Sequence, residues 1–323
     1  MPLLTHDNAA RSLSGLGFAA ISAVSFALSG PIAGGLLDAG WSPAAAVAVR
    51  VLIGGSVLVP PAVVALRGRW AQLRRQLPVL LLYGLGPVAG TQFAYFAALR
   101  HLPVAVALLI EYTSPIAVVA WLWLRHAQRP AALTVGGALL GMTGLVLVLD
   151  PGGGAFSWIG VGWALLAMLG AALYFLLSAR TGDALPGVVL AAGALLTGGV
   201  VLLLAGLVGV LPFTVTAATV ALGGAVLPWW VPVLALGVVT AALSYATGIE
   251  AARRLGARLA SFCGLAEVVA AVVLAWLLLG QVPRPVQLVG AALVLAGVAL
   301  VKLGEPEPAA APAEIAEITA RER

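Results

Sequence analysis

The chain has 323 residues, of which 62% are hydrophobic and 9% are charged, and its formal net charge is +5. Soluble domains carry charge on about a quarter of their residues, so this composition excludes a soluble globular protein and indicates an integral membrane protein. The positive charge does not point to a nucleic-acid partner, because the arginines lie between apolar runs, where they report membrane orientation.

Ten apolar runs follow one another along the chain, each near the length of about 20 residues that a spanning helix needs. The first follows a short polar segment, residues 1–14. It is too long for a signal peptide and lacks a convincing cleavage site, so we expect it to be retained. The last residues, 304–323, are rich in Pro, Ala and Glu and predict a disordered tail. The predicted spans are residues 15–37, 43–66, 78–99, 103–124, 131–149, 158–179, 185–211, 229–249, 258–279 and 286–301.

The basic residues alternate strongly between the two sides of these spans. With the N-terminus inside, two of the 17 lysines and arginines fall outside, Arg100 and Arg284, and one, Arg50, falls within a span. An excess of Lys and Arg marks the cytoplasmic side of a membrane protein. We therefore expect both termini to be cytoplasmic. The residues on that side are Arg11, Arg67, Arg69, Arg74, Arg75, Arg125, Arg129, Arg180, Arg253, Arg254, Arg258, Lys302, Arg321 and Arg323.

The two halves of the chain resemble each other. A shift of 153 positions aligns Arg100 with Arg253, Trp123 with Trp276, Gln128 with Gln281, Pro130 with Pro283, Gly137 with Gly290 and Gly144 with Gly297. A slightly different shift aligns Gly15 and Phe18 with Gly160 and Trp163. We predict two repeats, 15–150 and 158–303. Five spans in each would give them opposite orientations, which is typical of secondary transporters that bind substrate between the repeats.

Two carboxylates lie within matching spans. Glu111 is near the middle of the fourth, and Pro115 four residues later predicts a helix break whose freed backbone groups need partners such as substrate, water or the hydroxyls of Thr113 and Ser114. Ionisable groups at this depth usually serve function. A structural pair with another helix, for example through Arg50, is the alternative for Glu111.

Glu267 in the ninth span has three open roles. A carboxyl in an apolar cavity could exchange a proton, hold a substrate ammonium group, or pair with Arg50. Arg50, about two turns into the second span, is in turn either a clamp for a substrate carboxylate or the neutralising partner of one glutamate.

Further polar residues are candidates for the cavity wall. Gln92 and Tyr95 share a face of the third span, and Tyr112, Ser114 and Tyr245 lie in the fourth and eighth. The single cysteine, Cys263, and three histidines in connecting or terminal segments form no metal-ligand pattern. We predict no metal, no cofactor and no enzymatic activity.

The segments AALRHLPVAVALLIEYTSPIAVVAWLWL (97–124) and AARRLGARLASFCGLAEVVAAVVLAWLLLGQ (251–281) resemble the drug/metabolite transporter superfamily, in its branch of ten-helix EamA-type permeases. IEYTSP is similar to a stretch of the threonine/homoserine exporter subgroup. The chain departs from the family's usual Glu-Pro pair, with Ser114-Pro115 in one half and Glu267-Val268 in the other.

The resemblance implies an all-α integral membrane protein of ten helices in two inverted five-helix repeats, in the inner membrane. It implies export of small amphipathic metabolites, most of all amino acids, either threonine/homoserine-like or aromatic, by alternating access. Partners are a small molecule, the lipid bilayer and, as a candidate coupling ion, protons; the oligomeric state stays open. Alternatives are a broad multidrug exporter, and a non-transporting scaffold or lipid-modifying enzyme.

Overall fold

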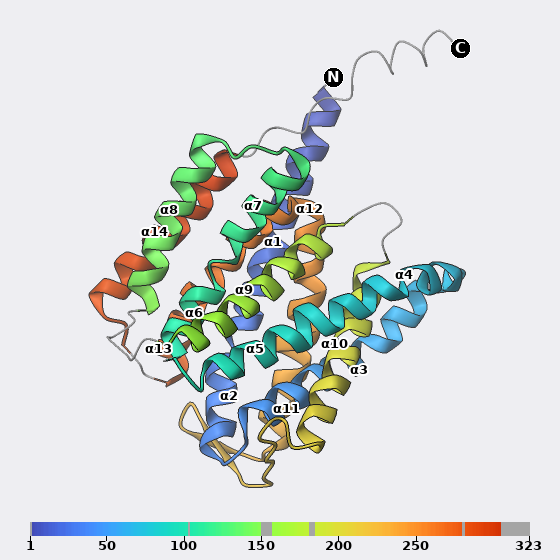
Figure 1. The fold of residues 1–323 in the computed structure, drawn as a ribbon, viewed down its shortest axis with the longest axis vertical. Coiled ribbons are helices and arrows are strands. Elements are labelled where there is room, and N and C mark those ends of the chain that lie inside the picture. Colours follow the sequence, from blue (N-terminus) through green and yellow to red (C-terminus); the bar gives the residue numbers. More distant parts are fainter. Residues whose placement is uncertain (1, 103, 150–156, 181–184, 280–281, 305–323) are drawn as a thin grey trace.

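The computed structural model describes residues 2–102, 104–149, 157–180, 185–279 and 282–304, which form a bundle of helices (Figure 1). The first turns of α1 and the end of α14 lie at the same end of this bundle. The helices are α1 Pro2–Ala27, α2 Ser29–Asp38, α3 Pro43–Ala65, α4 Trp70–Tyr83, the π-helix η1 Gly84–Gly90, α5 Thr91–Ala98, α6 Val104–Glu111, α7 Ser114–His126, α8 Ala132–Leu149, α9 Trp158–Ser178, α10 Gly187–Leu207, α11 Trp230–Gly237, the π-helix η2 Val238–Leu243, α12 Ser244–Gly264, α13 Ala266–Leu279 and α14 Pro285–Leu303.

Within the described residues, nine helical stretches are long and apolar enough to cross a membrane, rather than the ten that we expected. The difference arises because the expected eighth span and the start of the ninth form one stretch, Trp230–Gly264. Its helical geometry is interrupted at Gly256, where φ is 80° and ψ is 163°. The rest of the expected ninth span is α13, which at 14 residues is shorter than the other spans. The expected tail from residue 305 onward lies outside the described residues.

Two kinds of helix irregularity occur twice, at positions 153 residues apart. The π-helix η1 begins at Gly84, and η2 directly follows its counterpart, Gly237. The break between α6 and α7 likewise corresponds to the break at Leu265 between α12 and α13. The counterpart of Glu267 is therefore Ser114, not Glu111. The two glutamates lie in matching spans but on opposite sides of the two breaks.

The contact between α8 and α14, at one edge of the bundle in Figure 1, is reciprocal. Gly137 faces the carbonyl oxygen of Gly297, and Gly144 faces that of Gly290. Because Gly137 aligns with Gly290 and Gly144 with Gly297, each helix makes the contact that its counterpart makes. Small residues allow such close approach of helix backbones in membranes.

Gly144→Ala should therefore destabilise the protein by about 1–3 kcal/mol, the usual cost of overpacking. A methyl group at Gly144 would lie 2.6 Å from both the Gly290 carbonyl oxygen and the Val294 nitrogen. These are backbone atoms, which cannot rotate away from the methyl group as a flexible side chain could. Gly136→Ala is the matched control, since nothing lies within 4 Å of a methyl group there. Thermal unfolding in detergent measures both variants. Equal melting temperatures would contradict the packing argument.

One element departs from the expected all-α fold. In the connection between α10 and α11, two short strands pair antiparallel, β1 Val220–Leu222 and β2 Ala225–Leu227. Gly223 and Gly224 join them with φ of 58° and 80°, values that glycine adopts readily and that suit a tight hairpin. Val220 is fully buried and packs against Gly35 of α2, which anchors the hairpin.

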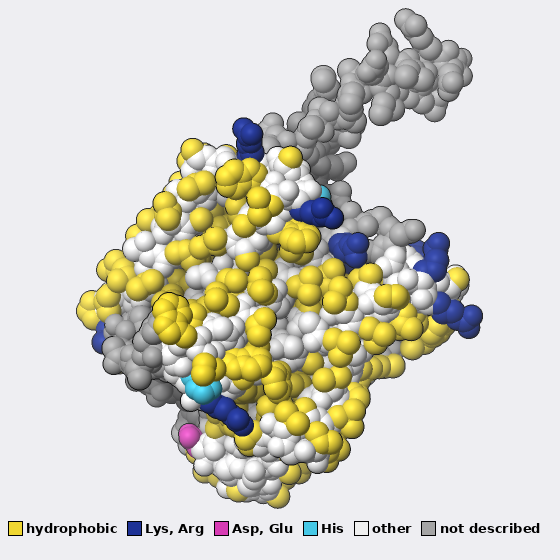
Figure 2. Space-filling model, viewed as in Figure 1, with side chains coloured by type: hydrophobic (Ala, Val, Ile, Leu, Met, Phe, Trp, Pro, Cys, Tyr) yellow, Lys and Arg dark blue, Asp and Glu magenta, His cyan; other side chains and the backbone are white. Residues whose placement is uncertain are grey.

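Hydrophobic side chains are spread over much of the face shown in Figure 2. On the face shown there, most of the Lys and Arg side chains gather toward the upper end and the right-hand edge, and few charges interrupt the middle. Together with the apolar helical stretches, this distribution indicates a multi-pass membrane protein.

Candidate functional site

A cavity of about 150 Å³ lies where α1, α5, α9 and α12 meet the two broken helices. It brings together most of the residues that the sequence predicted: Gln92, Glu111, Tyr112, Ser114, Tyr245 and Glu267. Two of the predicted residues, Arg50 and Tyr95, and the helix-breaking Pro115 do not line it.

The break beside Glu111 forms as Pro115 predicted. α6 ends at Glu111 and α7 begins at Ser114, with Pro115 in the first turn of the new helix, where a missing N–H costs nothing. The Ile110 carbonyl beside the break accepts from both the Thr113 hydroxyl, at 2.6 Å, and the Thr113 N–H, at 3.1 Å. Ser114 is buried, and its hydroxyl-bearing side chain lines the cavity at the N-terminus of α7.

The two glutamates differ in their surroundings. Tyr112 donates its hydroxyl to Oε1 of Glu267 at 2.8 Å. Glu267 also lies in the first turn of α13, where the helix dipole favours a negative charge. The Glu111 carboxylate makes no hydrogen bond or ion pair with another described residue, although it lies close enough to Glu267 for the two charges to interact. The cavity therefore contains one carboxylate held by a hydrogen bond, Glu267, and one without a hydrogen-bond or ion-pair partner among the described residues, Glu111.

Arg50 forms no ion pair with either glutamate in the described part of the chain. Its Nη2 donates to the Thr240 carbonyl of η2 at 2.5 Å, and its guanidinium lies 4.3 Å from the ring centre of Phe26. Phe26 is part of the cavity wall. Arg50 is therefore one layer behind the cavity, where it fixes an aromatic side chain and interacts with Glu267 only through its charge.

Tyr95 also lies behind the wall. It stands on α5 three residues after Gln92, and its ring packs 5.8 Å from that of Phe96. Tyr95 is close enough to Glu111 for their charges to interact, but the cavity itself is reached by Gln92.

A cluster of aromatic rings in the cavity wall was not predicted as a unit. Tyr174 lies at its centre, with ring-centre distances of 5.7 Å to Tyr245 and 5.0 Å to Phe175. Phe26 extends the wall at 6.4 Å from Tyr245. These aromatic residues stand out in the sequence, but their spacing does not say which way each helix faces. The combined wall suits a flat apolar ligand group.

Gly248 is a further residue that the sequence did not single out. A methyl group at this position would overlap the Tyr174 hydroxyl and lie 2.8 Å from Oγ of Ser22. Ser22 itself donates to the Ser244 carbonyl at 2.8 Å. The missing side chain thus leaves room for two hydroxyls at the cavity edge. No group of three His, Cys, Asp or Glu side chains in the described ranges could hold a metal ion.

Residues 13–150 and 158–303 each match the model of the EamA-like transporter family. The aromatic amino acid exporter YddG of Ancylobacter novellus is 32% identical over 111 residues, which make up 34% of this chain and 38% of that exporter. A solved crystal structure of a protein superposes with a TM-score of 0.73 at 24% identity, over 90% of this chain and 96% of the other, a likeness of fold alone. Since the two matched segments cover most of its length, the chain belongs to the EamA-like transporter family.

Proposed function

We propose that this protein exports amino acids, aromatic ones foremost, as a secondary transporter that works by alternating access. The observation that carries the proposal is the cavity, which is lined by two carboxylates and a cluster of aromatic rings. A cavity that is apolar apart from a few convergent polar groups is the usual form of a small-molecule site. The name of the partly similar exporter points in the same direction.

An aromatic amino acid would complement this cavity group by group. Its ammonium would lie between Glu111 and Glu267, where a positive charge relieves the repulsion of two carboxylates. Its carboxylate would meet the N-terminus of α7 near Ser114, since half-helix N-termini receive anionic substrate groups in transporters. Its ring would pack on Tyr174 and Tyr245. A proton on either glutamate would replace the ammonium once the substrate leaves, which would couple export to protons.

We further propose ten spans in two inverted repeats, 15–150 and 158–303, with both termini in the cytoplasm and the protein in the inner membrane. The reciprocal contacts support this architecture. Besides the α8–α14 pair, Gly55 of α3 faces Leu196 of α10, and Gly199 of α10 faces Leu52 of α3. Exchange of equivalent partners is what a twofold relation between two copies produces. The family model, which matches each half separately, supports it too.

Counterflow in liposomes tests the function. The purified protein is reconstituted with unlabelled amino acid inside, and uptake of radiolabelled phenylalanine, tyrosine, tryptophan, threonine and homoserine is followed with and without a pH gradient. We expect aromatic amino acids to accumulate fastest, and faster with protons available for exchange. Uptake that ignores the gradient would indicate exchange without protons. No uptake of any amino acid by folded protein would remove the proposal.

One feature also suits a multidrug exporter. A carboxylate such as Glu111, which has no partner among the residues that the structure describes, could hold an aromatic cation as well as an amino acid in this cavity. Resistance of overexpressing cells to aromatic cationic drugs, without amino-acid counterflow, would favour this second function.

A further inference from the structure

The end of the molecule away from the chain termini is open at a second pocket, of about 440 Å³. The pocket lies between the start of α3, the end of α5, the start of α9 and the residues after α10. Pro43, Arg100 and His101 on its wall are exposed, and Phe96 and Trp163 are half-buried. The Arg100 guanidinium makes no hydrogen bond or ion pair with another described residue.

The counterparts of these residues in the other half of the chain are packed together. Arg100 corresponds to Arg253 and Phe96 to Ile249 by the shift of 153 positions, and Pro43, the first residue of α3, corresponds to Gly187, the first residue of α10. Arg253 donates from Nη2 to the Leu185 carbonyl just before α10, and a methyl group at Gly187 would touch both Arg253 and Ile249 at 3.4 Å. Ile249 is fully buried. The region that is open at one end is therefore sealed at the other.

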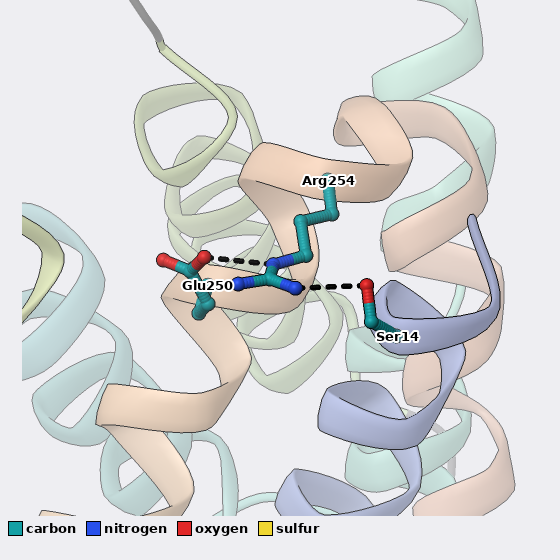
Figure 3. A network of polar contacts seen from close by, with 3 residues as sticks. All are labelled: Ser14, Glu250 and Arg254. Atoms are coloured by element: carbon teal, nitrogen blue, oxygen red, sulfur yellow. Dashed lines mark hydrogen bonds and ion pairs between the residues drawn. The ribbon is translucent and has the colours of Figure 1, made fainter. Parts of the chain in front are cut away.

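A polar network strengthens this seal (Figure 3). Nε of Arg254 pairs with Oε1 of Glu250 at 2.8 Å, and Nη1 donates to Oγ of Ser14 at 2.8 Å, which ties α12 to α1. The Arg254 guanidinium also lies 4.6 Å from the ring centre of Phe18. Phe18 and Arg254 correspond to Trp163 and His101, which line the open pocket instead.

We propose that Arg100 is a gating residue, the counterpart of Arg253, and that it closes the pocket by binding main-chain carbonyls of residues 41–43 when Arg253 releases Leu185. This inference rests on the inverted repeats of the proposed function. Two copies of one fold that differ in conformation can exchange their conformations, so the seal formed by one half shows how the other half closes. The structure is then the state open to the outside, with the cytoplasmic end closed.

A cysteine on the pocket wall reports whether the pocket is open. Ala97→Cys places a thiol there, and intact cells are treated with a membrane-impermeant thiol reagent. Mass spectrometry of the purified protein then gives the labelling rate at position 97, separately from Cys263. We expect ready labelling. Arg253→Ala should lower the rate by up to about tenfold, because loss of one hydrogen bond from a charged group shifts the equilibrium away from the state with the sealed cytoplasmic end by about that factor.

Arg100→Ala should act in the opposite direction. Alone it should leave labelling as fast or faster, and combined with Arg253→Ala it should restore most of the rate. Arg253→Lys, which keeps the charge without the planar fork, is the second variant if Arg253→Ala does not fold. Arg284→Ala, the other arginine expected outside, is the control and should change nothing.

No labelling at position 97 in the parent chain, an unchanged rate in Arg253→Ala, or a double variant that remains slow would overturn the inference. The labelling needs no substrate, so it is independent of the counterflow result. If amino acids show counterflow but Arg253→Ala leaves the labelling rate unchanged, the gating role of Arg100 is wrong and the proposed function stands. If the labelling rates change as predicted but no amino acid shows counterflow, the proposed substrate is wrong and the gating role stands.

Discussion

Glu267→Gln should lower the initial rate of aromatic amino-acid counterflow by about 10- to 100-fold. The substituted side chain keeps an oxygen that can accept from Tyr112, so the local packing survives while the charge is lost. A hydrogen bond to a charged group contributes about 1.5–3 kcal/mol, and each 1.4 kcal/mol corresponds to about tenfold in binding. The rate and its pH dependence are measured in the same liposomes.

Two further variants test the charge of the second carboxylate and the hydrogen bond to the first. Glu111→Gln should be as harmful as Glu267→Gln, because the Glu111 carboxylate has no described protein partner to stabilise and is therefore available to substrate. Tyr112→Phe keeps both charges and removes one donor, so its effect should be smaller. Normal transport by both glutamine variants across the pH range would exclude a carboxylate mechanism.

Gly248→Ala should reduce counterflow about tenfold while the protein still folds. The added methyl group competes with the Tyr174 hydroxyl and with Oγ of Ser22, and overpacking of this kind costs about 1–3 kcal/mol. The displaced tyrosine would move into the space that the substrate ring needs. Counterflow of phenylalanine, with unlabelled phenylalanine as competitor, measures both rate and apparent affinity.

A second substitution tests this steric explanation. Tyr174→Phe removes the overlapping oxygen, so the double variant Gly248→Ala with Tyr174→Phe should recover most of the lost rate. Gly162→Ala on α9 is the control, because nothing lies within 4 Å of a methyl group there. A double variant as slow as Gly248→Ala would show that Gly248 matters for another reason.

The helical membrane fold could be predicted because hydropathy and arginine positions are visible along the sequence without any knowledge of how the helices pack. They located the apolar runs correctly, apart from the joint at Gly256. There a single residue with positive φ interrupts the helix, and the helical segments before and after it follow each other directly, so that the expected eighth span and the start of the ninth form one stretch. The hairpin at Gly223 and Gly224 was missed because the surrounding residues form strands of only three residues each.

The site was predictable where the sequence contains an unusual residue in an apolar run. Glu111, Glu267 and Pro115 are such residues. Arg50 was equally conspicuous, but its partners, the Thr240 carbonyl and the Phe26 ring, depend on how α3 packs against η2 and α1, which no local pattern encodes. The role of Gly248 is defined only by a hydroxyl on another helix.

The two π-helices have a consequence for the rotation of the helices around the cavity. A π-turn holds one residue more than an α-turn, and one residue corresponds to about 100° around a helix axis. Without η1, Gln92 would be turned by that angle away from the cavity that it now lines, and without η2 the same would hold for Tyr245. The number of residues in these turns, more than their identity, determines which side chains the cavity receives. Deletion of one residue from either turn would rotate the following helix, so that a different set of its side chains would line the cavity. A substitution in the turn would change a single contact.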